Sequence, residues 1–181
     1  MRKIDIPFGQ PILDIEEIEA VKKVLEGPIL AHGPVCAEFE NAFSGFTESK
    51  FAISVASGTA ALHLCLYASN IGPGDEVIVP AMSHVAIAHA VEYCGAKPVF
   101  ADVDPKSGNI SPESISNSLT ERTKAIMVVH FLGLPCEMDA INRIASSIGA
   151  LVFEDTALAL GAKYGNKISG NLATAGCFSF Y

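Results

Sequence analysis

The feature that most constrains the fold is an alternation of short apolar runs with longer amphipathic stretches along the chain. Residues 125–129, Ala-Ile-Met-Val-Val, are continuously apolar, which is typical of a parallel strand that helices cover on both faces. Stretches with a helical period, such as residues 14–26, alternate with these runs. The alternation predicts a three-layer α/β/α fold, and a length of 181 residues fits about one domain.

The predicted elements follow one another closely, with turn residues between them. We expect strands at residues 51–55, 76–79, 98–103, 124–130, 151–154 and 177–180. We expect helices at residues 14–26, 34–46, 58–70, 84–94, 111–119 and 138–148. Residues 164–167 contain the pair Gly-Asn and predict a hairpin turn.

The composition excludes several classes of protein. Apolar residues make up 50% of the chain and charged residues 18%, so the chain is not disordered. The net charge of -8 repels phosphate backbones, and we expect no nucleic-acid partner. No run reaches the roughly 18 apolar residues of a membrane helix, so we expect no membrane association. Asp5 and Pro7 interrupt any signal-peptide core, and we place the protein in the cytoplasm.

The five cysteines are odd in number and widely spaced, and no Cys-x-x-Cys pair occurs. This pattern disfavours a disulfide framework and a zinc site, and we expect reduced, mostly buried thiols. His84 and His89 are about 140° apart around a helix, so they do not share a face and we expect no metal. His63 and His130 lie inside apolar runs, which favours histidines whose nitrogens are satisfied within the core.

Ligands of open α/β sheets bind at the carboxyl ends of the strands, which makes the residues after each strand candidates for a site. Ser57-Gly58-Thr59 joins a predicted strand to a helix, where free backbone N–H groups and the helix dipole favour a phosphate. An ordinary N-cap has the same pattern. Glu154-Asp155 follows another strand, where a carboxylate either pairs with a cationic group of a ligand or remains a cap or solvated charge.

Five segments in order resemble one known family more specifically than any of them does alone. They are residues 57–64, 72–80, 98–104, 154–157 and 176–181. The series resembles the DegT/DnrJ/EryC1/StrS family of sugar aminotransferases, which are pyridoxal-phosphate enzymes of fold type I. The resemblance implies that residues 1–181 are the N-terminal part of the cofactor-binding large domain, with N-terminal helices at 14–46. It also implies that the chain is truncated and lacks the small C-terminal domain.

The resemblance assigns cofactor roles to five residues. Gly58 and Thr59 match the loop that holds the cofactor phosphate, and Ser179 matches a hydroxyl that binds the same group. His84 stands where the family usually has an aromatic ring stacked on the pyridine. Asp155 matches the carboxylate that keeps the pyridine nitrogen protonated, a charge that lets the ring act as an electron sink.

Two departures from the family pattern affect the expected chemistry. Leu158 stands where the family often has a glutamine that contacts the ring hydroxyl, and a leucine cannot donate that hydrogen bond. The Schiff-base lysine of the family would lie just beyond Tyr181. Lys163 and Lys167 match non-catalytic positions, so we expect no catalytic residue in this chain and no activity from the chain alone.

The resemblance implies an enzyme that moves an amino group from glutamate to a nucleotide-linked keto sugar in surface polysaccharide or related biosynthesis. A sugar dehydratase of the same family, with histidine in place of the lysine, is one alternative, and a non-catalytic truncated remnant is another. The family is dimeric, so we expect a homodimer. Apolar strand faces left uncovered at Val128, Val129, Phe178 and Phe180 would also favour self-association.

Overall fold

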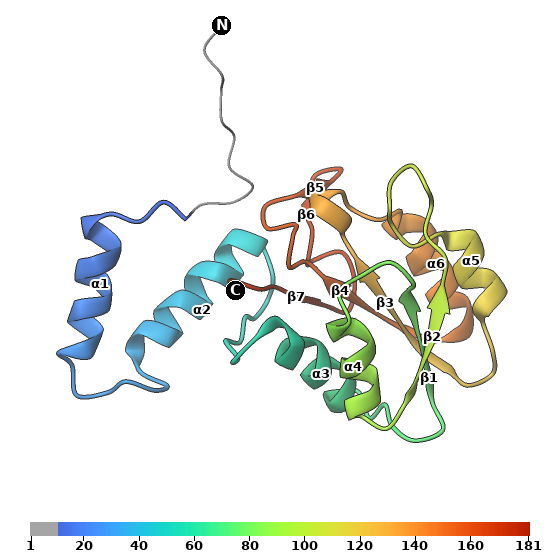
Figure 1. Ribbon diagram of the computed structural model, residues 1–181, viewed down its shortest axis with the longest axis horizontal. Coiled ribbons are helices and arrows are strands. Elements are labelled where there is room, and N and C mark those ends of the chain that lie inside the picture. The colour runs from blue at the N-terminus through green and yellow to red at the C-terminus, as the bar shows by residue number, and fades with distance from the viewer. Residues whose placement is uncertain (1–10) are drawn as a thin grey trace, which may run out of the picture.

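The computed structural model describes residues 11–181, and its centre is a parallel five-stranded sheet (Figure 1). The strand order is β2-β1-β3-β4-β7, and every neighbouring pair is parallel. The strands are β1 (Glu76–Pro80), β2 (Lys97–Ala101), β3 (Thr123–Val129), β4 (Leu151–Asp155) and β7 (Ala175–Cys177). A separate antiparallel hairpin pairs β5 (Lys163–Tyr164) with β6 (Lys167–Ile168), as the turn residues predict.

Helices cover both faces of the sheet, which confirms the three-layer fold. One face packs against α3 (Gly58–Ala68) and α4 (Ala86–Tyr93). The other face packs against α5 (Pro112–Ser118) and α6 (Met138–Ile148). Val128 and Val129 are buried between these layers, so the expectation that they lie uncovered is wrong. No helix within residues 11–181 is long and apolar enough to cross a membrane.

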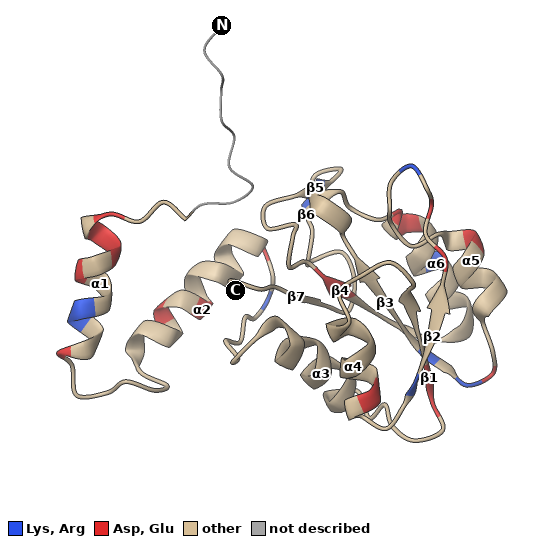
Figure 2. Ribbon diagram, viewed as in Figure 1, with Lys and Arg blue, Asp and Glu red and all other residues tan. Residues whose placement is uncertain are grey.

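Successive side chains of β4 enter opposite cores, as the two-residue period of a strand requires. Val152 packs in the core below α5 and α6, whereas Phe153 packs in the core below α3 and α4. Glu154 therefore shares the face of Val152, and Asp155 shares the face of Phe153 and of α3. This alternation decides what each acidic residue can contact. Figure 2 shows the acidic end of β4 within the domain, surrounded mainly by uncharged residues.

The two N-terminal helices differ in how they are held. Helix α2 (Pro34–Thr47) packs on the C-terminal segment, where the rings of Phe43 and Phe178 meet edge to face at 4.9 Å. Helix α1 (Ile15–Leu25) begins with a capping box formed by Asp14 and Glu17, but it has no buried residue. It lies apart from the sheet in Figure 1, with its apolar stripe in solvent.

Two strand predictions are wrong. Residues 51–55 form no strand, and Ile53 is 80% exposed, because no described strand lies beside them to complete a ladder. Their backbone bonds to a side chain instead, since the N–H of Ser54 donates to Glu40 Oε1 at 2.7 Å. The last strand lies at Ala175–Cys177 rather than 177–180, because pairing with β4 ends at Cys177, opposite Asp155.

The five cysteines are all free, as expected, but fewer are buried than the sequence indicated. Cys136 and Cys177 are buried, Cys65 and Cys94 are partly buried, and Cys36 is exposed.

Candidate functional site

Three segments meet at the carboxyl edge of the sheet: the start of α3, the end of β4 and the residues after β7. Strands β4 and β7 run side by side, so Asp155 lies opposite Cys177 and the chain then continues to Ser179. Helix α3 contacts both strands, and Gly58 at its start lies against Ser179. Three of the predicted site residues, Gly58, Asp155 and Ser179, are thereby gathered at this edge.

The start of α3 combines an N-cap with free donors. Ser57 adopts an extended backbone, and its Oγ accepts a hydrogen bond from the N–H of Ala60 at 3.1 Å. A cap of this kind uses a donor deeper in the first turn and leaves the N–H groups of Gly58 and Thr59 without a partner in the helix. The N-cap and the anion cradle are therefore compatible, and these two N–H groups can bind an anion.

Ser179 lies directly against Gly58. A β-carbon built on Gly58 would be 3.2 Å from Ser179 Cβ, 3.4 Å from the carbonyl oxygen of Phe178 and 3.6 Å from Ser179 Oγ. Only glycine leaves this space open at the helix start. The hydroxyl of Ser179 is half-buried and accepts a hydrogen bond from the N–H of Tyr181 at 3.2 Å. An anion at this corner can meet backbone N–H groups from one segment and a hydroxyl from another.

Asp155 is a buried carboxylate at the end of β4. Its Oδ1 accepts a hydrogen bond from the N–H of Ala157 at 3.0 Å, and no ion pair within residues 11–181 involves it. Burial raises the pKa of Asp155, although the N–H of Ala157 acts to lower it. A buried carboxylate with spare acceptor capacity is suited to a cationic N–H donor from a ligand.

His84 is exposed just before α4, and its Nδ1 accepts a hydrogen bond from the N–H of Ala86 at 3.2 Å. That bond orients the imidazole ring. Leu158 is about half exposed in the turn after β4. Lys163 and Lys167 lie on the β5–β6 hairpin.

The sequence did not predict the buried pair of His130 and Glu154. His130 Nε2 lies 2.9 Å from Glu154 Oε2, and both side chains are fully buried. The backbone N–H groups of Gly170 and Leu172 also donate to the Glu154 carboxylate. The sequence does contain a signal for this pair, because His130 ends one apolar run and Glu154 ends the next. The carboxyl ends of adjacent parallel strands lie side by side, which brings these two residues together.

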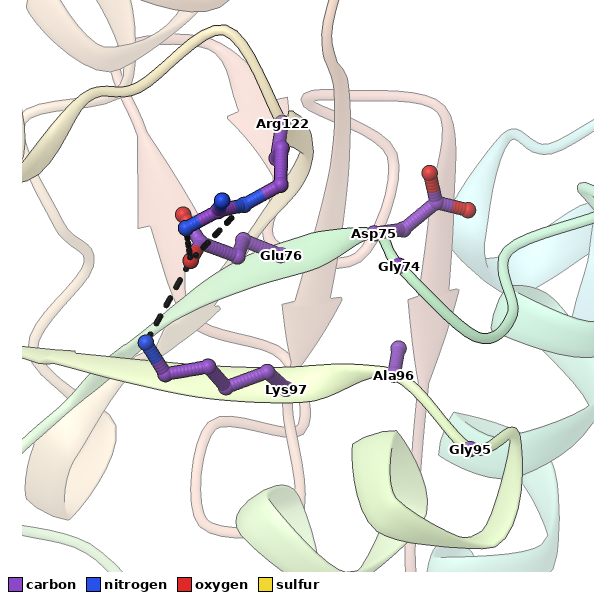
Figure 3. A pocket seen from close by; sticks show the side chains of 7 residues that line it. All are labelled: Gly74, Asp75, Glu76, Gly95, Ala96, Lys97 and Arg122. Atoms are coloured by element: carbon purple, nitrogen blue, oxygen red, sulfur yellow. Dashed lines mark hydrogen bonds and ion pairs between the residues drawn. The ribbon is translucent and has the colours of Figure 1, made fainter.

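A small pocket of about 270 Å³ lies at the opposite, amino-terminal end of β1 and β2 (Figure 3). Glu76 is buried there and accepts hydrogen bonds from Arg122 Nη2 at 2.7 Å, Thr120 Oγ1 at 2.6 Å and Lys97 Nζ at 3.3 Å. These donors hold the pKa of Glu76 down to about 2. The carboxylate is neutralised by its neighbours, so this pocket is a structural network separate from the predicted site.

The model of the DegT/DnrJ/EryC1/StrS aminotransferase family matches residues 11–181. GDP-perosamine synthase of Caulobacter vibrioides is 44% identical over 177 residues, which are 97% of this chain and 48% of that protein. The spore coat polysaccharide biosynthesis protein SpsC of Bacillus subtilis is 42% identical over 176 residues, which are 97% of this chain and 45% of that protein. The chain thus spans about half the length of the curated relatives it matches.

Solved structures agree in fold. An aminotransferase from Psychrobacter cryohalolentis superposes with a TM-score of 0.92 at 42% identity, over 96% of this chain and 45% of that one. A putative sugar aminotransferase, Spr1654 of Streptococcus pneumoniae, solved in its PLP form, superposes with a TM-score of 0.92 at 30% identity. The match covers 98% of this chain and 49% of that one. A mutant of the GDP-4-keto-6-deoxymannose-3-dehydratase ColD, solved with bound GDP-perosamine, superposes with a TM-score of 0.91 at 31% identity. The match covers 98% of this chain and 47% of that one.

Proposed function

The chain belongs to the DegT/DnrJ/EryC1/StrS aminotransferase family, and on that premise we propose that it holds the cofactor in an enzyme that aminates nucleotide-linked keto sugars. Pyridoxal phosphate is the cofactor that the family and its relatives solved in PLP and PMP forms indicate. Within this proposal, residues 1–181 are the N-terminal part of the cofactor-binding large domain. The residues at the carboxyl edge of the sheet fit that cofactor at both of its ends.

The phosphate end fits the corner between α3 and the segment after β7. The N–H groups of Gly58 and Thr59 and the hydroxyl of Ser179 would hold the phosphate, and the dipole of α3 favours its charge. A β-carbon on Gly58 would crowd Ser179, so the glycine lets the helix start and the segment after β7 lie close together. No lysine or arginine is needed there, since helix N-termini bind phosphate without one.

The ring end fits Asp155. Its buried carboxylate would accept the N–H of the pyridinium, which keeps that proton on the ring nitrogen and supplies the cation that the carboxylate lacks. When bound, the protonated ring withdraws electrons from the substrate carbon, which is the chemistry that amino-group transfer requires. His84, which the family resemblance assigns to the stacking position, would pack its imidazole against the ring. Leu158 can offer the ring only an apolar contact.

The parent enzyme, by this proposal, moves the amino group of glutamate to a keto sugar carried on a nucleotide. The curated relatives support this substrate class, because their names state GDP-perosamine synthesis and spore coat polysaccharide biosynthesis. We further propose that it acts in the cytoplasm as a homodimer, without nucleic-acid or membrane partners. An aminotransferase at 42% identity and GDP-perosamine synthase at 44% support amination. The dehydratase ColD at 31% is as similar to this chain as the sugar aminotransferase Spr1654 at 30%, so the product formed by the full-length protein decides between the two reactions.

The observation that carries the proposal is the meeting of Gly58, Ser179 and the buried Asp155 at one edge of the sheet. The test uses the full-length protein with glutamate and a nucleotide-linked keto sugar. We expect amino sugar and 2-oxoglutarate in equal amounts, and a fall of several orders of magnitude for Asp155→Ala, because an unpaired buried charge costs about 3–5 kcal/mol. A deoxy sugar as product would favour the dehydratase, and near-native turnover by Asp155→Ala would refute the role of this carboxylate.

A further inference from the structure

Glu154 is a fully buried carboxylate that the proposed cofactor contacts do not use. Its Oε2 accepts hydrogen bonds from His130 Nε2 at 2.9 Å and from the N–H of Gly170 at 2.7 Å. Its Oε1 accepts one from the N–H of Leu172 at 2.7 Å. Because Glu154 and Asp155 point to opposite faces of β4, the Glu154 carboxylate lies on the face away from α3.

The hydrogen bonds of His130 fix its tautomer. Its Nδ1 accepts from the N–H of Cys136 at 3.1 Å, and a backbone N–H can only donate, so the ring proton is on Nε2. His130 therefore donates its Nε2 proton to Glu154 Oε2. The backbone of the histidine is tied to the site as well, because its N–H donates to the carbonyl oxygen of Asp155 at 3.1 Å.

Glu154 also reaches the phosphate end of the site through Gly170. This glycine has a φ of +93°, and a β-carbon there would lie 2.6 Å from Cε2 of Phe178. The ring of Phe178 thus packs against the backbone of Gly170. The N–H of Gly170 in turn donates a hydrogen bond to Glu154. The ring of Phe43 in α2 also contacts the ring of Phe178, edge to face, with 4.9 Å between the ring centroids. Phe178 directly precedes Ser179, so its packing sets where the hydroxyl lies.

We propose that Glu154 is a positioning residue that fixes the ring end and the phosphate end of the cofactor site relative to one another. Asp155 follows it in β4 and is held through His130, whereas Ser179 is held through Gly170 and Phe178. This inference rests on the proposed function for the identity of the ligand. The coupling of the two ends is a property of the chain itself and can be measured without the ligand.

The test is the substitution Glu154→Gln in the full-length protein. A glutamine places an amide NH₂ against one of the three donors, so a buried donor loses its partner, and we expect the Kd for pyridoxal phosphate to rise about tenfold or more. Pyridoxal, which lacks the phosphate, should bind more weakly too. The Kd values come from absorbance titration of cofactor-free protein well below its Tm.

Two double-substitution cycles separate positioning from general destabilisation. Glu154→Gln is combined with Asp155→Asn, which alters only the ring end, and with Ser179→Ala, which alters only the phosphate end. If Glu154 acts through both residues, its effect on the Kd shrinks in each pair. Full additivity in either cycle would overturn the coupling at that end.

Glu76→Gln is the matched control, since Glu76 is an equally buried, hydrogen-bonded glutamate at the other end of the sheet. We expect it to lower the Tm and leave the Kd for pyridoxal phosphate within about twofold. If Glu154→Gln behaves in the same way, its role is merely structural. His130→Asn, which removes one donor and leaves the charge of Glu154, provides a milder variant if Glu154→Gln does not fold.

Hydrogen exchange of the ligand-free protein distinguishes failure of this inference from failure of the proposed function. We expect Glu154→Gln to speed exchange at residues 155–157 and 178–181, and Glu76→Gln to leave both segments unchanged. Faster exchange confined to residues 168–172 would overturn the inference even if the wild type binds pyridoxal phosphate. A wild type that binds no pyridoxal phosphate would overturn the proposed function, while the exchange pattern would still decide the coupling.

Discussion

Ser179 and Gly58 occupy opposite sides of one small space, with 3.2 Å between Ser179 Cβ and the position that a β-carbon on Gly58 would take. The two residues come from different ends of the chain, one at the start of α3 and the other after β7. The proposed phosphate site therefore depends on the absence of a side chain at Gly58 as much as on the donors around it.

Gly58→Ala should weaken pyridoxal phosphate binding without destabilising the protein. The added methyl group crowds Ser179, the proposed hydroxyl donor to the phosphate, and we expect the Kd to rise about tenfold. Gly58 is the first residue of α3, and alanine there restricts the unfolded chain, which favours the folded state by roughly 0.4–1 kcal/mol and offsets the crowding. Gly45→Ala in α2 is the matched control, because a β-carbon there meets nothing within 4 Å. Equal Kd values for both variants would contradict the cradle.

Asp155→Asn should stabilise the cofactor-free protein at neutral pH while weakening cofactor binding. Burial raises the pKa of Asp155, so its charged form is disfavoured in the folded state. The stability linked to its proton is present below the unfolded-state pKa of about 3.9 and is lost as pH rises through the folded-state value. The Tm advantage of the asparagine variant should therefore shrink as pH falls. A variant that is less stable than wild type at pH 7 would exclude this account.

Glu76→Gln should destabilise the protein at neutral pH and progressively less in acid. Three donors lower the pKa of Glu76 from 4.5 to about 2, so the charged form stabilises the folded state above the unfolded-state value. That contribution is lost as pH falls through about 2. Chemical denaturation of both proteins between neutral pH and pH 2 measures the difference. Glu38→Gln, on the exposed surface of α2, should show no comparable pH trend.

The 181-residue polypeptide should associate with itself. Apolar side chains along α1 are exposed, including Ile15 at 64%, Ile18 at 59% and Leu25 at 66%, and Phe180 is exposed at the other end. A stripe of this size seeks a partner in water. Light scattering over a range of concentrations should show a mass that rises with concentration, and Ile18→Ser with Leu25→Ser should reduce it. A concentration-independent monomer would show that α1 is stable without cover.

The same polypeptide should have no measurable aminotransferase turnover. The residues proposed to hold the cofactor, Gly58, Thr59, His84, Asp155 and Ser179, include no lysine that could carry the amino transfer. Glutamate and a nucleotide-linked keto sugar, supplied with pyridoxal phosphate, should remain unconverted over hours. The full-length protein under identical conditions is the control. Conversion by residues 1–181 alone would require a catalytic group that this account does not include.

The hydrophobic pattern was sufficient to predict the layers. Helix α6 spans the predicted residues 138–148, and Pro112 begins α5 after the Ser111 cap. Residues 51–55 misled the prediction, because an apolar run shows that a segment can form a strand and says nothing about whether a neighbour is available. Helix α1 was correctly bounded within a residue, since its signals are local: a capping box and a basic last turn.

The sequence was sufficient to predict which segments form the candidate site, but not the contacts of Glu154 that hold those segments in place. Free N–H groups at a helix start and polar residues after parallel strands point to an edge of the sheet from sequence alone. The contacts of Gly170 with Glu154 and with Phe178 involve two residues, Gly170 and Phe178, that lie outside the helices and strands. The hydrophobic period of the sequence therefore does not predict these contacts. His130 was expected to be satisfied in the core, and it is, but its partner was not identifiable before β3 and β4 were paired.

Because successive side chains of β4 point to opposite faces, the order of the two adjacent acidic residues Glu154 and Asp155 should be under selection. Exchanging Glu154 and Asp155 would leave composition, charge and hydropathy unchanged, yet it would put the shorter carboxylate among three donors and the longer one in the space beside α3. A one-residue insertion within β4, before Glu154, would shift both side chains to the wrong face. Substitution scores that treat the two acids as interchangeable will therefore underrate the damage here, and insertions within this strand should be tolerated less than insertions in surface loops.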